Sequence, residues 1–109
     1  MTIEKKNITD AIPASLEEEW IQSLATGHHV TIERIVSKGH KSPDDFWYDQ
    51  DRHEWVLLLK GQARLLFEEG MQHIEMKAGD HLLIPSGKKH RVTWTDPLAE
   101  TVWLAVFFD

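Results

Sequence analysis

Two side chains of this chain, Glu54 and His90, can together perform acid and base chemistry. A carboxylate beside an imidazole can exchange protons with a bound molecule, because burial raises the pKa of the carboxylate and an imidazolium partner lowers it. The same two groups can instead hold a bound ligand through hydrogen bonds. We therefore treat Glu54 and His90 as a candidate catalytic acid–base pair, with simple ligand binding as the alternative.

Three further side chains could share a cavity with this pair. In an extended segment, residues separated by an even number of positions share a face, so Tyr48 and Gln50 can point the same way as Glu54. Trp94 shares a face with His90 for the same reason. A cavity with a few polar groups against an apolar wall is a binding site by default. We predict that Tyr48, Gln50 and Trp94 are ligand-binding residues.

Basic side chains near these segments have two interpretations each. Facing inward, Arg34 would be a ligand-binding residue that holds a carboxylate or phosphate bidentately; facing outward, it would be an ordinary surface arginine. The cluster of Lys88, Lys89 and Arg91 is either solubilising charge on a turn or a cationic rim that attracts an acidic small molecule.

A metal site is a further hypothesis for the same region. His90 and Glu54 are metal-ligating side chains, whereas the amide of Gln50 is a poorer ligand. His53 precedes Glu54 directly, so in a regular strand it faces the other way, and only a bulge or turn would bring it inward. The candidate ligands of one divalent transition metal are therefore His90, Glu54, Gln50 and His53, and a metal-free site is the leading hypothesis.

Short segments rich in β-branched and apolar residues, separated by turn residues, fill the chain from residue 30 onward. The segments expected to be strands are 30–36, 54–60, 63–67, 73–77, 82–84, 90–95 and 101–108. Many short strands with almost no helix between them indicate an all-β antiparallel sandwich or barrel. The last segment is apolar on both faces, so the N-terminal segment or a second subunit must cover the face that the core does not.

The N-terminal segment carries signals that are typical of a short helix. Ser15 and Glu18 have the spacing of a capping box, and apolar residues such as Trp20 recur at helical intervals before Gly27. We therefore expect residues 1–29 to form an arm and a helix that packs on the barrel, and residues 30–109 to form the β-barrel domain.

The run from Gly79 to His90, with Pro85 and Gly87 at fixed places between them, matches the second signature motif of the cupin superfamily in its spacing. Physically, its glycine and proline positions make two turns around a short apolar strand. The chain from residue 30 to 109 resembles small single-domain bacterial proteins known as cupin 2 domain-containing proteins.

The first cupin signature is only partly present. Glu54 and Gly61 stand at its glutamate and glycine positions, with six residues between them. The two positions where cupins usually carry metal-binding histidines are Tyr48 and Gln50 in this chain. Half of the usual ligand set is therefore absent.

The resemblance implies a cupin double-stranded β-helix, a jelly-roll barrel, to which we add the short N-terminal helix. It also implies a lined cavity of unassigned activity, which we expect to bind a small polar or acidic metabolite. The alternative is a metal-dependent cupin enzyme, a dioxygenase, isomerase or epimerase that acts on a small metabolite or sugar. Because cupins commonly pair through sheet faces, the resemblance also favours a homodimer.

Composition limits the remaining classes of function. The chain has 109 residues, a net charge of −6 and no cysteine, so it fits one domain without disulfides or thiolate metal sites. Nucleic acid is not an expected partner, because the chain lacks a basic face. It also lacks the roughly 20 apolar residues that span a bilayer and the apolar run of a secretion signal, so we expect a cytoplasmic protein without a membrane partner.

Overall fold

The structure is a computed structural model that describes residues 2–109. It consists of strands and one short 3₁₀ turn. The elements are β1 (Trp20–Thr26), β2 (Val30–Ser37), β3 (His53–Lys60), β4 (Gln62–Phe67), η1 (Glu69–Met71), β5 (Gln72–Lys77), β6 (His81–Ile84), β7 (His90–Thr95) and β8 (Thr101–Phe108). The all-β prediction is confirmed, and each expected strand is found with ends that differ by no more than about one residue.

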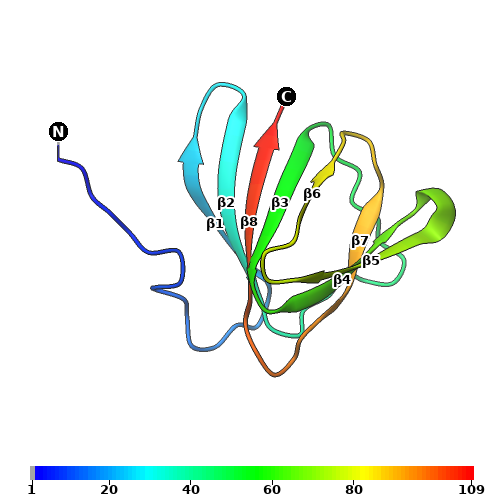
Figure 1. The fold of residues 1–109 in the computed structure, drawn as a ribbon, viewed down its shortest axis with the longest axis horizontal. Coiled ribbons are helices and arrows are strands. Elements are labelled where there is room, and N and C mark those ends of the chain that lie inside the picture. The colour runs from blue at the N-terminus through cyan, green and yellow to red at the C-terminus, as the bar shows by residue number, and fades with distance from the viewer. Residues whose placement is uncertain (1) are drawn as a thin grey trace.

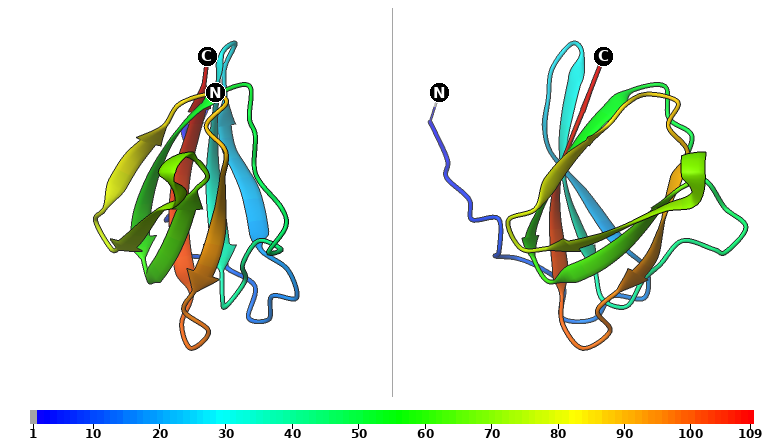
Figure 2. Two further views of the ribbon diagram at one scale, coloured as in Figure 1. Left: turned by 90° about the vertical axis from the view of Figure 1, so that its right-hand side faces the viewer. Right: turned by 45° about the vertical axis from the view of Figure 1, so that its right-hand side comes forward.

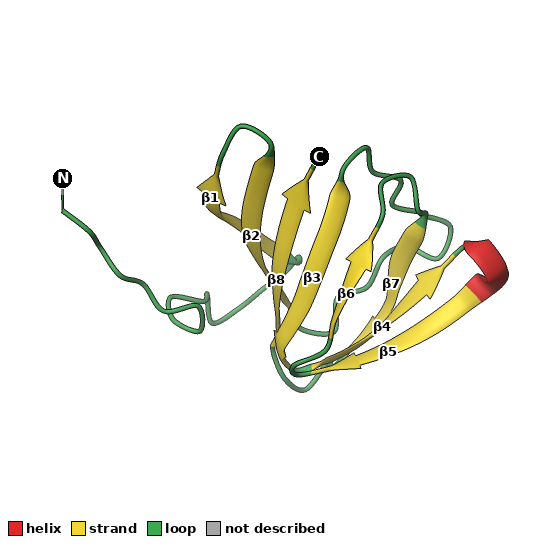
Figure 3. Ribbon diagram, turned by 45° about the horizontal axis from the view of Figure 1, so that its top comes forward, coloured by secondary structure: helices red, strands yellow, loops and turns green. Residues whose placement is uncertain are grey.

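The strands form two antiparallel sheets. The larger sheet has the order β1-β2-β8-β3-β6, and the smaller sheet has the order β5-β4-β7. The smaller sheet folds across one face of the larger one, so the two enclose a common interior (Figures 1 and 2). Apart from the hairpins β1–β2 and β4–β5, the paired neighbours are distant in sequence, as expected for a jelly-roll barrel. Figure 3 shows the helical turn η1 at the far end of the β4–β5 hairpin.

The core lies between the two sheets and is built by alternation along the strands. Leu58 of β3 is fully buried and pairs across the larger sheet with Trp103 of β8, which is 4% exposed. Leu65 of β4 and Met76 of β5 contribute from the smaller sheet to the same cluster. Burying side chains of this size contributes about 1.5–3 kcal/mol each to folding.

The predicted N-terminal helix is wrong. The residues from Trp20 onward form β1, an edge strand that pairs antiparallel with β2 from Trp20 opposite Val36 to Thr26 opposite Thr31. Gly27 lies in the turn of this hairpin rather than at the end of a helix. Local helix signals are weak compared with the backbone hydrogen bonds offered by the open edge of β2, and those bonds decide the structure.

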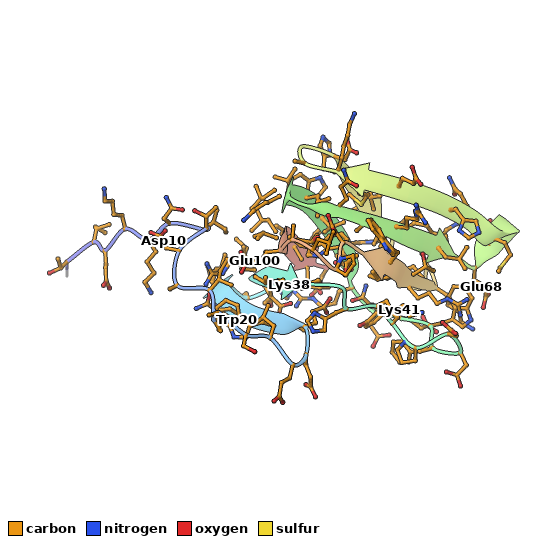
Figure 4. The ribbon with its side chains drawn as sticks, turned by 90° about the horizontal axis from the view of Figure 1, so that it is seen from below. Asp10, Trp20, Lys38, Lys41, Glu68 and Glu100 are labelled. Carbon is orange, nitrogen blue, oxygen red and sulfur yellow. The ribbon has the colours of Figure 1, made fainter. Side chains whose placement is uncertain are left out.

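Residues 2–19 form an arm that crosses the edge of the barrel and extends away from it toward the N-terminus (Figure 1). Figure 4 shows Asp10 on this arm beside Trp20, at the opposite end of the molecule from Glu68. Within residues 2–109, no helix is long and apolar enough to cross a membrane.

The outer face of the larger sheet carries apolar side chains that no helix covers. Leu57, Leu104 and Val106 are half-buried there, and Leu83 is 54% exposed. The same face on a second copy would be complementary to it. The homodimer therefore stays a prediction, and the outer face of the larger sheet is the surface through which we expect the two copies to pair.

Replacing Leu104 by glutamate is expected to prevent the predicted dimer from forming, because the substitution places a charge in the centre of the outer face. Sedimentation velocity measures the change directly. Leu98→Glu is the matched control, since Leu98 is 90% exposed in the loop before β8 and should leave the mass unchanged. A monomeric native protein would contradict the prediction.

Candidate functional site

A cavity of about 240 Å³ lies between the two sheets. Its wall is largely apolar, with polar side chains gathered on part of it. The lining residues are Glu19, Ile21, Glu33, Ile35, Tyr48, Gln50, Glu54, Val56, Leu65, Ile84, His90, Val92, Trp103 and Phe107. Four of the residues singled out from the sequence, Tyr48, Gln50, Glu54 and His90, are thus brought together.

Glu54 and His90 face each other inside this cavity. The distance from Glu54 Oε1 to His90 Nε2 is 3.7 Å, and the two side chains are 11% and 6% exposed. The Gln50 amide donates a hydrogen bond of 3.0 Å to Glu54 Oε1. Glu54 on β3 is thereby held in place while it approaches His90 at the start of β7.

The tautomer of His90 follows from the hydrogen bond that its second ring nitrogen, Nδ1, makes. Nδ1 lies 3.0 Å from the carbonyl oxygen of Lys88, and a carbonyl can only accept, so Nδ1 carries the proton and donates it. In the neutral ring, Nε2 is therefore unprotonated and faces Glu54. Two backbone hydrogen bonds between Tyr48 and His90 also bring the Tyr48 ring to a stacked position, 5.5 Å from the imidazole.

Burial is the main influence on the acidic groups of the site. It raises the pKa of Glu54, and the nearby carboxylates of Glu33 and Glu19 raise it further, while the Gln50 hydrogen bond and His90 oppose the increase. Burial also raises the pKa of the Tyr48 phenol, and the charge of Glu19 adds to this effect. Glu54 therefore holds its proton more tightly than an exposed carboxyl, and Tyr48 stays protonated at neutral pH.

Arg34 does not reach the cavity. It lies on the opposite face of β2, where it is 3% exposed and donates hydrogen bonds to the carbonyls of Ile8 and Asp10 and to the side chain of Gln22. Its guanidinium also lies 4.8 Å from the ring centre of Trp20. Arg34 anchors the N-terminal arm, and we do not include it in the ligand site.

Trp94 and His53 also lie away from the cavity. The Trp94 ring packs under the guanidinium of Arg64, 5.1 Å away. His53 faces the other way from Glu54, and its Nδ1 accepts a hydrogen bond from the backbone N–H of Ser86. The β3 strand therefore has no irregularity that would turn His53 inward at this point.

The basic cluster near His90 does not line the cavity either. Lys88 pairs with Glu69, Lys89 lies 4.0 Å from Glu68, and Arg91 covers the ring of Trp47. These are surface contacts on the outside of the barrel, which agrees with the interpretation as solubilising charge.

Two acidic cavity residues, Glu19 and Glu33, were not predicted from the sequence. Glu19 falls in the segment expected to be a helix, and the sequence leaves the orientation of the β2 side chains, Arg34 among them, open. The signal that could have found Glu33 is the register with β8, in which Ile35 pairs with Trp103 and Glu33 shares their face.

The donor set of this cavity does not fit a transition metal. Within residues 2–109, no three histidine, cysteine, aspartate or glutamate side chains come together in a geometry that could hold a metal ion. His90 supplies one imidazole, and Gln50 stands where a second imidazole would be needed, with its amide nitrogen on Glu54. We therefore derive no step of the chemistry through a metal.

The sequence profile of the cupin domain family matches residues 32–107. This chain belongs to the cupin family. The match covers every strand from β2 to β8 in whole or large part and includes Glu54 and His90. No curated protein is found to match this cupin.

Solved structures of the same fold are similar to this cupin. A protein of Ralstonia eutropha that is proposed to be a mannose-6-phosphate isomerase has 38% identity and a TM-score of 0.93, over 98% of this chain and 99% of that one. An RmlC-like cupin of Methanocaldococcus jannaschii with a double-stranded β-helix fold has 19% identity and a TM-score of 0.71, over 99% and 93%. A polyketide cyclase of Streptomyces resistomycificus has 16% identity and a TM-score of 0.75, over 98% and 80%. The last two show the fold alone.

Glu54→Gln is expected to stabilise this cupin at neutral pH. Because folding raises the pKa of Glu54, stability falls as the pH rises from the ordinary carboxyl range through the folded pKa, and the loss persists above it. Glutamine carries no charge and avoids this loss, so urea unfolding near pH 7 should show a gain of about 1 kcal/mol. Near pH 4 the gain should vanish. Glu75→Gln, at an exposed position paired with Arg64, is the control, and an equal effect of Glu54→Gln at both pH values would contradict the prediction.

Proposed function

We propose that this cupin binds a small polar molecule inside the barrel, with Glu54 and His90 making the principal polar contacts. The observation that carries the proposal is the pair itself, two buried ionisable side chains 3.7 Å apart in the wall of a cavity. Buried groups of this kind are costly unless a partner or a ligand satisfies them.

The rest of the cavity supports the same function. An apolar wall with a few convergent polar groups is typical of small-molecule sites. Tyr48 and Gln50 add a hydroxyl and an amide next to the pair. The volume of about 240 Å³ restricts the ligand to a small metabolite.

A second candidate function is proton transfer, as in an isomerase or epimerase. With Nδ1 donating to the Lys88 carbonyl, Nε2 of His90 faces Glu54, and the raised pKa of Glu54 brings this carboxyl closer to the range in which it can exchange a proton with a substrate. The Ralstonia relative, proposed to be a mannose-6-phosphate isomerase, has a name that suggests such chemistry. A phosphorylated sugar is disfavoured for this cupin, because no lysine or arginine is among the described residues that line the cavity.

A cavity-filling variant tests the binding function. Val92 lines the cavity without contacting Glu54 through a hydrogen bond or ion pair, so Val92→Phe should abolish the NMR chemical-shift changes that a metabolite library produces. Thr93→Phe, at the next position of the same strand and outside the residues that line the cavity, is the control and should bind as the native protein does. Binding that survives Val92→Phe would place the ligand elsewhere.

Glu54→Gln separates the two candidate functions. If the protein is an enzyme, this variant should still bind the substrate but lose turnover, because glutamine cannot exchange a proton. If it is a binding protein, the variant should change only the affinity. A ligand that binds tightly without being converted by the native protein would exclude the enzyme.

A further inference from the structure

The charges on the cavity wall have one sign. Three carboxylates line it, Glu19 just before β1, Glu33 on β2 and Glu54 on β3. In the part of the chain that the structure describes, no lysine or arginine lines the same cavity, and His90 is its one imidazole. Carboxylates that share a partly buried space repel one another, and the repulsion falls when a cation enters.

The protein itself compensates little of this negative charge. Glu19 accepts a hydrogen bond of 2.9 Å from the hydroxyl of Ser37, and Glu54 accepts one from the amide of Gln50. Both donors are neutral. Among residues 2–109, Glu33 has no side-chain hydrogen bond and no ion pair. The cavity therefore offers at least two carboxylates to a ligand.

A second observation concerns the indole of Trp103, which forms part of the same wall. Trp103 is 4% exposed, and its Nε1–H has no hydrogen-bond partner among the described residues. Buried donors without an acceptor are rare and destabilise the folded protein. An oxygen acceptor on a ligand would satisfy this donor, while the faces of the Trp103 and Phe107 rings attract ammonium groups.

We propose that the ligand of this cavity is a small organic ammonium ion that also carries an oxygen acceptor. Its ammonium group lies against Glu33 and Glu54, and its oxygen accepts from Trp103. The inference rests on the proposed binding function and adds the charge class of the ligand. It differs from the acidic metabolite that was one expectation from the sequence.

Three probes of nearly equal size and different charge test the proposal, namely 3-aminopropanol, 3-hydroxypropanoate and 1,3-propanediol. Binding is followed in ¹H–¹⁵N spectra at neutral pH through the indole N–H signal of Trp103, which is assigned with Trp103→Phe. The aminopropanol should shift this signal in a saturable way. The diol should bind at least about tenfold more weakly, and the hydroxypropanoate should produce no shift at the same concentrations.

Matched variants locate the contact. Glu33→Gln should weaken the binding of 3-aminopropanol by about tenfold, because it removes one charge-assisted contact. Glu75→Gln makes the same change on β5 outside the cavity and should leave the affinity unchanged. Equal or tighter binding of 3-hydroxypropanoate, or an unchanged affinity in Glu33→Gln, would overturn the ammonium proposal and leave the binding function standing. No shift of any cavity signal with all three probes would overturn both.

Discussion

Gly61→Ala is expected to destabilise this cupin by about 3–5 kcal/mol. Gly61 joins β3 to β4 with φ of +92°, in a region that residues with a Cβ rarely adopt. An added Cβ would lie 2.6 Å from Thr101 Cα and 2.8 Å from the carbonyl oxygen of Glu100. Both are backbone atoms of the segment that begins β8, so neither can rotate away. Urea unfolding monitored by tryptophan fluorescence measures the loss.

Gly79→Ala separates the close approach from the backbone strain. Gly79 has a similar φ of +95°, but an added Cβ there has no heavy atom within 4 Å. Gly79→Ala should therefore lower the free energy of unfolding by only about 1–2 kcal/mol, through the backbone conformation alone. Equal losses in the two variants would contradict the idea that the approach of β8 requires glycine at position 61.

Arg34→Met should cost about 2–3 kcal/mol and release the N-terminal arm. Methionine keeps the apolar length of the side chain but cannot donate to the carbonyls of Ile8 and Asp10. The arm should then be cleaved faster after Glu17 or Glu18 by a glutamate-specific protease, which gel analysis of timed digests would show.

Arg64→Met is the matched control for this variant. Arg64 also lies over a tryptophan, Trp94, and pairs with Glu75, but its side chain is 52% exposed, and it has no hydrogen bond or ion pair with residues 2–19. Its stability should change by less than about 1 kcal/mol, and the cleavage of the arm should stay at the native rate. Equal cleavage in both variants would show that Arg34 does not hold the arm.

The strands from residue 30 onward could be predicted because their ends are encoded locally. Glycine and proline residues such as Gly61, Gly79 and Pro85 interrupt β-branched runs, and each interruption corresponds to a turn in the structure. The segment before residue 30 could not be predicted in this way. Its capping signals involve only neighbouring residues, whereas the conformation of Trp20–Thr26 is set by pairing with β2. That pairing cannot be read from the local sequence pattern.

The orientation of the β2 side chains is a second feature that the sequence pattern could not predict. Both of its faces contain β-branched residues, so alternation alone could not decide whether Arg34 or Glu33 faces the cavity. Only the register with β8, which places Ile35 beside Trp103, settles the question. The polar residues of the cavity were easier to predict. Glu54 and His90 occupy motif positions, and the even spacing of Tyr48 and Gln50 from Glu54 puts these two side chains on the same face as Glu54.

The most direct test of the cavity is a crystal structure of untagged protein soaked with 3-aminopropanol, with anomalous data collected above the absorption edges of the first-row transition metals. We expect density for the probe within hydrogen-bonding distance of Glu54 and no anomalous peak beside His90. An anomalous peak between His90 Nε2 and Glu54 would show a metal centre and contradict the account, as would a cavity that stays without the probe.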